Sequence, residues 1–367
     1  MKMMKAKTLC RTSFQFPDDG PLMISGPCSA ESEKQLLITA RLLQATGRVH
    51  IFRAGIWKPR TRPASFTGYG LKAIPWLSEV TKVTGLPVCT EVALPEHIEP
   101  CLKAGIRIFW LGSRTVSNPF SVQIIADELK GADCCVMVKN PLNPDPELWG
   151  GALERLQKAG VKTLAAIHRG FYPFEKSSLR NIPKWELAIE MKLRFPEIPV
   201  ICDASHIAGK RETVAAVAQK ALDLNMDGLM IETHYRPSSA LSDARQQLTP
   251  LAFNKLLQGL VFRDQDKERA LYLESLEPLR DQVDSVDAQL IDLLVQRMKI
   301  VERIGDYKRR HNLAILQVKR WREVMESMLI QGRKGGLSTA FLDTILKAIH
   351  TESIRKQTSI YRKKAKS

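Results

Sequence analysis

Over the first 260 residues, short apolar runs alternate with longer segments in which apolar residues recur every three or four positions. Runs of the first kind are typical of buried strands, and segments of the second kind are typical of amphipathic helices. The helical stretches 33–47 and 146–160 each end in glycine before the next apolar run, as helix C-termini often do. The predicted strands lie near Pro21–Ser25, Val49–Arg53, Leu86–Glu91, Arg107–Leu111, Cys134–Lys139, Lys162–Ile167, Ile198–Cys202 and Gly228–Glu232.

Strands that alternate with helices predict a parallel sheet of the α/β class. Eight strand–helix units over roughly 250 residues have the number and size of a (β/α)8 TIM barrel. We therefore expect residues 1–262 to form such a barrel, with a doubly wound open sheet as the alternative.

The pattern changes after Phe262. A charged link is expected at 263–272, and an all-α helical domain at 273–367. The first predicted helix carries a coiled-coil-like apolar seam and would be roughly 50 Å long, more than a domain of this size covers alone. We expect this domain to form a homodimer through the seam, or part of a higher homo-oligomer. The predicted helices span 276–309, 319–331 and 337–357.

The composition, 44% hydrophobic and 26% charged residues, is that of an ordinary globular protein. No run approaches the ~18 apolar residues of a membrane helix, and no secretory signal is evident. Seven cysteines form no C-x-x-C pair, which indicates reduced thiols and a cytoplasmic location.

The net charge of +16 indicates anionic partners. The basic residues lie singly at strand ends rather than in a stripe interleaved with aromatic residues. Small phosphorylated or carboxylated substrates therefore fit better than nucleic acid, and no membrane partner is expected.

Polar residues follow all eight predicted strands, at the end of the barrel where barrel enzymes place their chemistry. Each one alone is more simply read as structural or solvated. Together, several cations around one opening repel one another unless anions lie between them, and Lys–Arg clusters suit phosphate. The basic side chains among these residues therefore predict a two-anion site. The residues at the strand ends are Cys28, Arg53, Lys58, Arg60, Thr61, Glu91, Arg114, Lys139, His168, Arg169, His206, Glu232 and Asp243.

Four of these residues, Cys28, His206, Glu232 and Asp243, offer sulfur, nitrogen and oxygen ligands. Such a mixture suits a divalent transition metal ion, for which we expect Mn²⁺, with Fe²⁺, Co²⁺ or Zn²⁺ as alternatives. The four follow strands one, seven and eight, which are neighbours in a closed barrel. An open coordination position would let the ion act as a Lewis acid on a carbonyl.

The motifs GPCSAE, KPRTRP, PVCTEV, GSRT, VMVKNP, DASH and IETH, with a His-Arg-Gly step, occur in barrel order. Residues 1–260 thereby resemble 3-deoxy-D-arabino-heptulosonate 7-phosphate (DAHP) synthases of the short type I-beta form. The resemblance implies the same four metal ligands and binding of erythrose 4-phosphate by Arg60 and Thr61. It also implies that phosphoenolpyruvate is held by Arg53, Lys58, Arg114, Lys139 and Arg169.

By the same resemblance, Lys58 is the candidate proton donor to the new alkoxide, with His168 acting through water as the alternative. One departure is Ala204, which stands where related sequences often have proline. A rival family is 3-deoxy-D-manno-octulosonate 8-phosphate synthase, which has a similar barrel and also uses phosphoenolpyruvate. The KPRT turn argues against it, because that family resembles KANRS there.

In the helical domain, Arg297 and Lys308 lie on or beside the seam, and 11 residues are about three helical turns. Both therefore point the same way, whereas Arg280 could enter the pocket of a dimer mate. The alternative reading is that these are surface cations. Residues 273–358 resemble the all-helical chorismate mutases, with matches at Arg280, Arg297, Lys308, Arg320, Ser353 and Gln357.

The resemblance implies that the arginines hold the two carboxylates of chorismate, while Lys308 and Gln357 bond its ether oxygen. Gln317 and Trp321 stand where the family has acids that contact the chorismate hydroxyl. The sequence thus predicts a bifunctional enzyme whose fused mutase senses prephenate or chorismate and adjusts the synthase. The alternatives for the C-terminus are a non-catalytic effector-binding or dimerisation module and, last, basic helices that bind nucleic acid.

Overall fold

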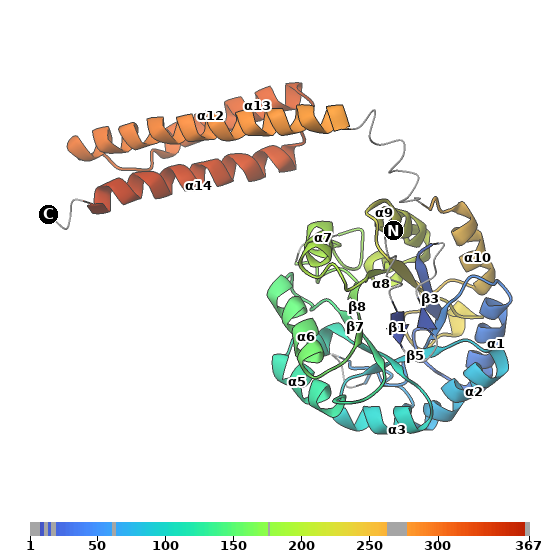
Figure 1. Cartoon of the computed structure of the whole chain (residues 1–367). Helices are drawn as coiled ribbons and strands as arrows, with labels where there is room; N and C mark the ends of the chain where they lie inside the picture. Colours follow the sequence, from blue (N-terminus) through green and yellow to red (C-terminus); the bar gives the residue numbers. More distant parts are fainter. Residues whose placement is uncertain are drawn as a thin grey trace. The chain divides into compact units, whose positions relative to one another are not determined.

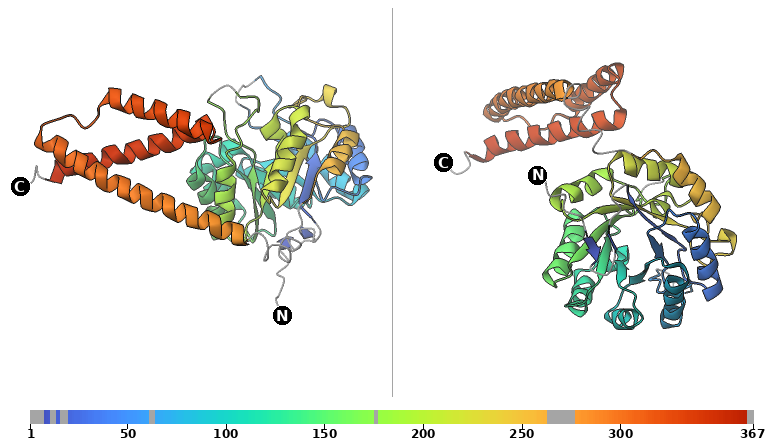
Figure 2. Two further views of the ribbon diagram at one scale, coloured as in Figure 1. Left: turned by 90° about the horizontal axis from the view of Figure 1, so that it is seen from above. Right: turned by 45° about the vertical axis from the view of Figure 1, so that its right-hand side comes forward.

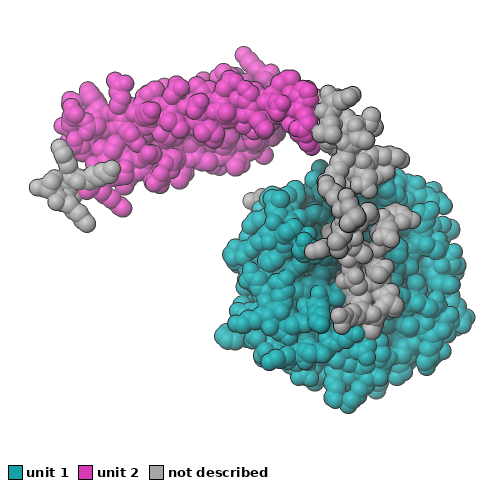
Figure 3. Space-filling model, in the orientation of Figure 1, with its two compact units in different colours: residues 1–263 teal, residues 264–367 magenta. Residues whose placement is uncertain are grey.

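The computed structural model describes residues 8–10, 14–15, 20–60, 64–174, 177–262 and 277–363 (Figure 1). The chain divides into two compact units, Met1–Arg263 and Asp264–Ser367, which are coloured separately in Figure 3. The linker expected at 263–272 lies outside the described residues. None of the helices in the described ranges is long and apolar enough to cross a membrane.

The first unit contains a closed barrel of eight parallel strands, which confirms the predicted TIM barrel and excludes the open sheet. Closure occurs between the last and the first barrel strand, where Glu232 lies opposite Gly26. Helices surround the strands, as the two views in Figure 2 show. The barrel strands, in order, are β3 Leu22–Gly26, β4 Ile51–Arg53, β5 Val88–Val92, β6 Ile108–Leu111, β7 Cys135–Lys139, β8 Thr163–His168, β9 Val200–Asp203 and β10 Gly228–Glu232.

The barrel strands are buried on both faces, and alternate side chains point into and out of the barrel. The inward residues form one apolar cluster that includes Ile51, Trp110, Met137, Ile201 and Met230. The outward residues pack with the helices into a second, larger cluster. The barrel interior is therefore filled by side chains, and only the residues at the strand ends are free to line a site.

Short connections place the helices around the barrel, and several helices begin at a capping side chain. Ser32, Asn118, Asp145 and Thr249 each accept a hydrogen bond from a backbone N–H in the first helical turn. The helices of this unit are α1 Glu33–Gln44, α2 Ile74–Thr84, α3 Ile98–Lys103, α4 Ser113–Val116, α5 Pro119–Glu128, α6 Pro146–Lys158, α7 Trp185–Arg194, α8 Ala204–Ala208, α9 Arg211–Asp223 and α10 Pro250–Gly259. Three 3-10 turns, η1 Gly70–Ala73, η2 Pro95–His97 and η3 Pro237–Ser239, and a two-stranded sheet of β1 Thr8–Cys10 and β2 Phe14–Gln15 complete the described elements.

The second unit consists, in its described part, of three helices, α12 Glu277–Arg310, α13 Val318–Lys334 and α14 Thr339–Lys363. Their bounds agree closely with the three predicted helices. Much of the apolar seam on α12 is exposed in the single chain: Leu279, Val283 and Leu290 are 53–58% exposed.

Candidate active site and metal centre

Side-chain alternation brings four charged residues to the inner face of the barrel at the C-terminal strand ends. Asp203 follows the inward Ile201 by two positions, and Glu232 follows the inward Met230 by two. Arg53 and Lys139 end β4 and β7 on the same face. All four side chains are buried.

These charges are paired across the barrel. Lys139 Nζ donates to Asp203 Oδ2 at 2.8 Å, and Arg53 Nη2 lies 3.1 Å from Glu232 Oε1. The Arg53 guanidinium also lies 4.8 Å from the centroid of the Trp110 ring. Buried charges need such partners, because an unpaired one costs several kcal/mol. The floor of the site therefore consists of two buried ion pairs, each formed by one carboxylate and one cation.

A cluster of possible metal ligands adjoins this array. One ligand atom each from Cys28, Glu232 and Asp243 lies within 4.8 Å of the other two. Glu232 Oε1 is buried without a hydrogen bond, and the Cys28 thiol lies 3.5 Å from Asp243 Oδ2. A thiol and two carboxylates drawn together in this way fit a divalent transition ion.

His206, the fourth predicted ligand, borders the cluster. Its Nε2 lies 3.7 Å from Asp243 Oδ2, while Asp203 holds its Nδ1 at 2.9 Å. A carboxylate on Nδ1 leaves Nε2 to face the cluster, the usual arrangement behind a metal-bound histidine. Burial lowers the pKa of His206, although the Asp203 charge opposes this.

The electrostatics of the cluster also indicate a bound cation. Burial, aided by Glu232, raises the pKa of the Cys28 thiol to about 12. Burial alone would raise the pKa of Asp243, but His206 and Arg180 lower it below its usual range. Asp243 is therefore ionised, whereas the Cys28 thiol would lose its proton only beside a bound cation.

Sequence reasoning missed three residues of this centre. Asp203 orients His206, Gln246 Nε2 donates to Glu232 Oε2 at 2.6 Å, and Arg180 Nη1 lies 3.1 Å from Asp243 Oδ1. The sequence did contain a signal for Asp203. It lies two positions after the apolar Ile201 in a strand, so alternation points both side chains into the barrel. Arg180 and Gln246 lie in loops, where no periodicity marks a side chain's direction.

The predicted anion-binding residues lie around the same opening. Lys58 is buried, and its ammonium group fits because residue 55 is glycine: a Cβ there would overlap Lys58 Nζ. Arg169 is also buried, with Nη1 donating to Asn181 Oδ1 at 2.9 Å. Burial lowers the pKa of Arg169 to about 10, so it remains a cation at neutral pH. Buried, incompletely compensated cations of this kind suit phosphate or carboxylate.

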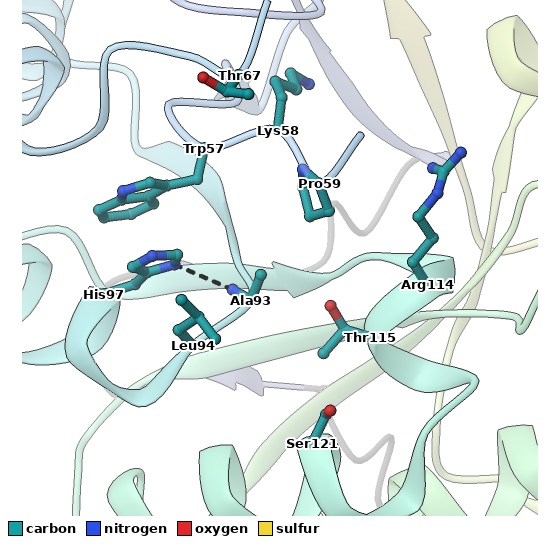
Figure 4. Close-up of a pocket in the computed structure, with 10 residues that line it drawn as sticks. All are labelled: Trp57, Lys58, Pro59, Thr67, Ala93, Leu94, His97, Arg114, Thr115 and Ser121. Atoms are coloured by element: carbon teal, nitrogen blue, oxygen red, sulfur yellow. Dashed lines mark hydrogen bonds between the residues drawn. The ribbon is translucent and has the colours of Figure 1, made fainter. Parts of the chain in front are cut away.

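A cavity of about 440 Å³ opens beside these cations (Figure 4). Lys58 and Arg114 contribute its positive groups, and Thr115 and Ser121 contribute hydroxyls. Arg60 lies at the turn above and donates to the Phe66 carbonyl at 2.9 Å. Thr61 lies outside the described residues.

His168 is not at this opening. The neighbouring Ile167 points into the barrel, so His168 points outward, into the layer between strands and helices. Burial lowers its pKa to about 3, and neither ring nitrogen makes a hydrogen bond of good geometry. This position argues against the expected role in proton transfer. Its ring packs at centroid distances of 5.1–6.2 Å against those of Trp149, Phe171 and Trp185.

In the helical unit, α12 and α14 bring several predicted residues together. Arg297 Nη1 donates to Ser353 Oγ at 2.7 Å, and Gln357 is buried one turn further along α14. Lys308 Nζ donates to the Ile315 carbonyl at 2.6 Å. Burial lowers the pKa of both Arg297 and Lys308.

The remaining predicted residues of this unit lie apart from that group. Arg280 and Arg320 have side chains that are 56% and 72% exposed, each beside a glutamate of its own helix. Gln317 is the N-cap residue of α13, and the Trp321 ring stacks on His350 with centroids 3.5 Å apart. A single chain therefore does not bring all of the predicted chorismate-binding residues together.

Comparison with known proteins agrees with both units. Residues 12–266 match the DAHP synthetase I family, and residues 279–358 match chorismate mutase type II. A phospho-2-dehydro-3-deoxyheptonate aldolase of Thermotoga maritima is 30% identical over 65% of this chain and 68% of its own. A 2-dehydro-3-deoxyphosphooctonate aldolase of Nitratidesulfovibrio vulgaris is 27% identical over 60% and 84%.

Among solved structures, the DAHP synthase of Thermotoga maritima aligns with a TM-score of 0.60 and 26% identity, covering 71% of this chain and 72% of that one. The family match spans more than half of the sequence and includes the whole barrel with its clustered ligands. The chain therefore belongs to the DAHP synthetase I family and carries a chorismate mutase type II domain after its barrel.

Proposed function

We propose that the barrel joins phosphoenolpyruvate to erythrose 4-phosphate, giving 3-deoxy-D-arabino-heptulosonate 7-phosphate and inorganic phosphate. The observation that carries this proposal is the ligand group of Cys28, Glu232 and Asp243 beside buried, incompletely compensated cations. Two anionic substrates require both features, one to activate a carbonyl and one to hold phosphate and carboxylate groups.

The residues of the chain bind and orient the two substrates. Arg169, Lys139 and Arg114 would hold phosphoenolpyruvate, with Arg53 fixed beneath it. The methylene carbon of phosphoenolpyruvate attacks the aldehyde carbon of erythrose 4-phosphate, and the aldehyde oxygen becomes an alkoxide. Lys58, buried at the edge of the cavity, donates a proton to that oxygen. Water then adds at C2 of the former phosphoenolpyruvate, and phosphate leaves.

A divalent ion held by Cys28, His206, Glu232 and Asp243 would supply Lewis acidity toward the aldehyde. The mixed ligand set favours Mn²⁺, Fe²⁺, Co²⁺ or Zn²⁺ over a hard ion such as Mg²⁺. We propose Mn²⁺ as the first of these to test.

For the helical unit we propose the rearrangement of chorismate to prephenate in a homodimer. The cations Arg297 and Lys308 are partly desolvated, and Arg297 contacts Ser353 on α14. They would hold a carboxylate and the ether oxygen, on which negative charge develops, while Gln357 donates from the opposite helix. Arg280 would come from the second copy.

One experiment tests both activities. We would assay the wild type, Cys28→Ala and Arg297→Ala with phosphoenolpyruvate plus erythrose 4-phosphate and, separately, with chorismate, each before and after chelation. We expect Cys28→Ala and chelation to abolish only the synthase, and Arg297→Ala to abolish only the mutase. A synthase that survives chelation, or a mutase that survives Arg297→Ala, would contradict the corresponding assignment.

A second candidate reaction replaces erythrose 4-phosphate with arabinose 5-phosphate. It is favoured by the identity of 25–27% to several 2-dehydro-3-deoxyphosphooctonate aldolases. The sequence KPRT at 58–61 favours the four-carbon substrate. Comparing kcat/KM for the two aldose phosphates decides between them.

We also propose that prephenate or chorismate, bound to the helical unit, changes the synthase rate. The fusion of both activities in one chain motivates this. Titrating prephenate into the full-length synthase assay tests it, with the Arg297→Ala variant as control. An unchanged synthase rate at saturating prephenate would remove the proposal.

A further inference from the structure

The cavity of Figure 4 has two unlike sides. Lys58 and Arg114 supply charge, whereas the stacked rings of Trp57 and His97 form an aromatic wall across the cavity from Arg114. The charged side suits the anionic end of a substrate, and the aromatic wall suits its carbon chain.

The two rings of the wall are closely stacked. Their centroids lie 3.8 Å apart and their planes differ by 3°. The His97 ring is fixed by its Nδ1, which accepts a hydrogen bond from the Ala93 backbone N–H at 3.2 Å. On the Trp57 side, a Cβ at Gly70 would lie 3.0 Å from the indole Nε1, so a larger residue would crowd the ring. The wall is therefore rigid.

The stack also joins two loops of the barrel. Trp57 belongs to the loop after β4, and His97 ends η2, which follows β5. Trp57 directly precedes Lys58, whose backbone N–H donates to the Thr67 carbonyl at 2.8 Å. The Lys58 backbone is therefore held between this hydrogen bond and the stacked side chain of its neighbour Trp57.

We propose that Trp57 and His97 form a positioning pair that sets the width of the aldose phosphate pocket and the place of Lys58. This inference rests on the proposed synthase reaction. Neither ring takes part in the chemistry, because a stacked wall only limits how the carbon chain can lie. The pair should therefore affect the aldose phosphate most, and phosphoenolpyruvate less, through the place of Lys58.

The test measures steady-state kinetics of the full-length, Mn²⁺-loaded protein and of Trp57→Ala and His97→Ala. We expect each alanine variant to raise KM for erythrose 4-phosphate about three- to tenfold, the range expected for losing one aromatic pair. KM for phosphoenolpyruvate should rise less than KM for erythrose 4-phosphate, because only the place of Lys58 links it to the stacked rings. The preference for erythrose 4-phosphate over arabinose 5-phosphate should fall, because the wall no longer limits chain length.

Conservative variants separate stacking from other effects. Trp57→Phe and His97→Phe keep an aromatic wall and should recover most of the wild-type KM. Trp76→Ala is the matched control, since its ring packs against Tyr69 and does not line the cavity. It should leave both KM values unchanged.

The outcomes distinguish the inference from the proposed function. If the wild type does not turn over erythrose 4-phosphate, the proposed function fails whatever the variants do. If the wild type is active and both alanine variants keep its KM for erythrose 4-phosphate, the positioning pair is wrong. Equal rises in both KM values, with a lowered unfolding midpoint, would show a merely structural role and also overturn it.

Discussion

Asp203 contacts two of the groups on which the site depends. Its Oδ2 accepts from Lys139 Nζ at 2.8 Å, and its Oδ1 lies 3.0 Å from His206 Nδ1. Oδ1 also accepts the His206 backbone N–H, which caps the short helix α8. Burial would raise the pKa of Asp203, but His206 and Lys139 lower it well below its usual value. One buried carboxylate thus orients His206, a proposed metal ligand, and pairs with Lys139, a proposed substrate-binding cation.

Asp203→Asn should weaken Mn²⁺ binding about 10- to 100-fold, the usual cost of losing a partner behind a metal ligand. Asparagine still caps the helix, but Lys139 loses its charge partner, so the variant should be about 3–5 kcal/mol less stable and its folding is checked by thermal unfolding. Isothermal titration calorimetry of the full chain with Mn²⁺ measures the effect. Asp127→Asn, on the exposed face of α5, is the control. Wild-type affinity in Asp203→Asn would show that His206 needs no such support.

His168→Phe tests the outward position of that histidine. Because its pKa in the folded protein is about 3, the unfolded chain takes up a proton first as the pH falls below 6.5. His168 should therefore reduce stability progressively from pH 6.5 toward 3, by at most about 1.4 kcal/mol per pH unit. Phenylalanine should remove this part of the acid sensitivity in denaturant titrations at pH 4.5–7.5.

The same variant should keep its synthase activity, since the ring packs among aromatic residues in the layer between strands and helices rather than lining the barrel opening. Activity lost from a folded His168→Phe protein would return the histidine to the list of proton donors. An unchanged pH dependence of stability would contradict its burial in the neutral form.

At the scale of elements, the alternation of short apolar runs with helical stretches predicted the barrel strands. For most strands, the predicted first and last residues lie within two positions of the observed ones. Gly228–Glu232 has the predicted bounds. Strand β8 extends one residue beyond the expected Ile167, so His168 follows the strand alternation and points outward instead of lining the opening. Arg180 and Gln246 were missed because their directions depend on loop contacts with Asp243 and Glu232 that no local pattern encodes.

The close contact of α12 with α14 depends on Gly305. A Cβ at this position would lie 3.0 Å from Gln357 Cγ and 3.2 Å from Ile360 Cδ1. Gly305→Val should therefore separate the helices, displace Gln357 and lower mutase kcat/KM at least tenfold, with about 1–3 kcal/mol of lost stability from overpacking. Synthase activity should be unaffected.

Thermal unfolding measures the lost stability of Gly305→Val, and assays of the mutase and the synthase measure its two activities. Gly335→Ala is the control, because its nearest atom would lie 3.4 Å from the new Cβ, an ordinary contact. Full mutase activity in Gly305→Val would mean that Gln357 does not act from its observed position.

At the scale of the whole molecule, the two units differ in whether one chain supplies all the residues of the candidate site. The barrel gathers its candidate ligands and cations within one chain. The helical unit leaves Val283, Val286, Leu290 and Leu293 of α12 53–59% exposed, and Arg280 lies away from the Arg297–Ser353 pair. The sequence alone indicated dimerisation from helix length, and the exposed seam supports the same expectation.

A shared site predicts complementation between two inactive variants. Arg280→Ala and Arg297→Ala should each abolish mutase activity, because every site in either homodimer lacks one arginine. In a heterodimer of the two, one site receives both wild-type arginines and the other receives neither. Random exchange of equal amounts makes one half of the dimers heterodimers, so about a quarter of wild-type activity should return.

The double variant Arg280→Ala/Arg297→Ala is the control, and its mixture with either single variant should recover no activity. If both arginines instead serve a site within one chain, no mixture regains activity, whereas intact activity in Arg280→Ala alone would exclude this arginine from the site.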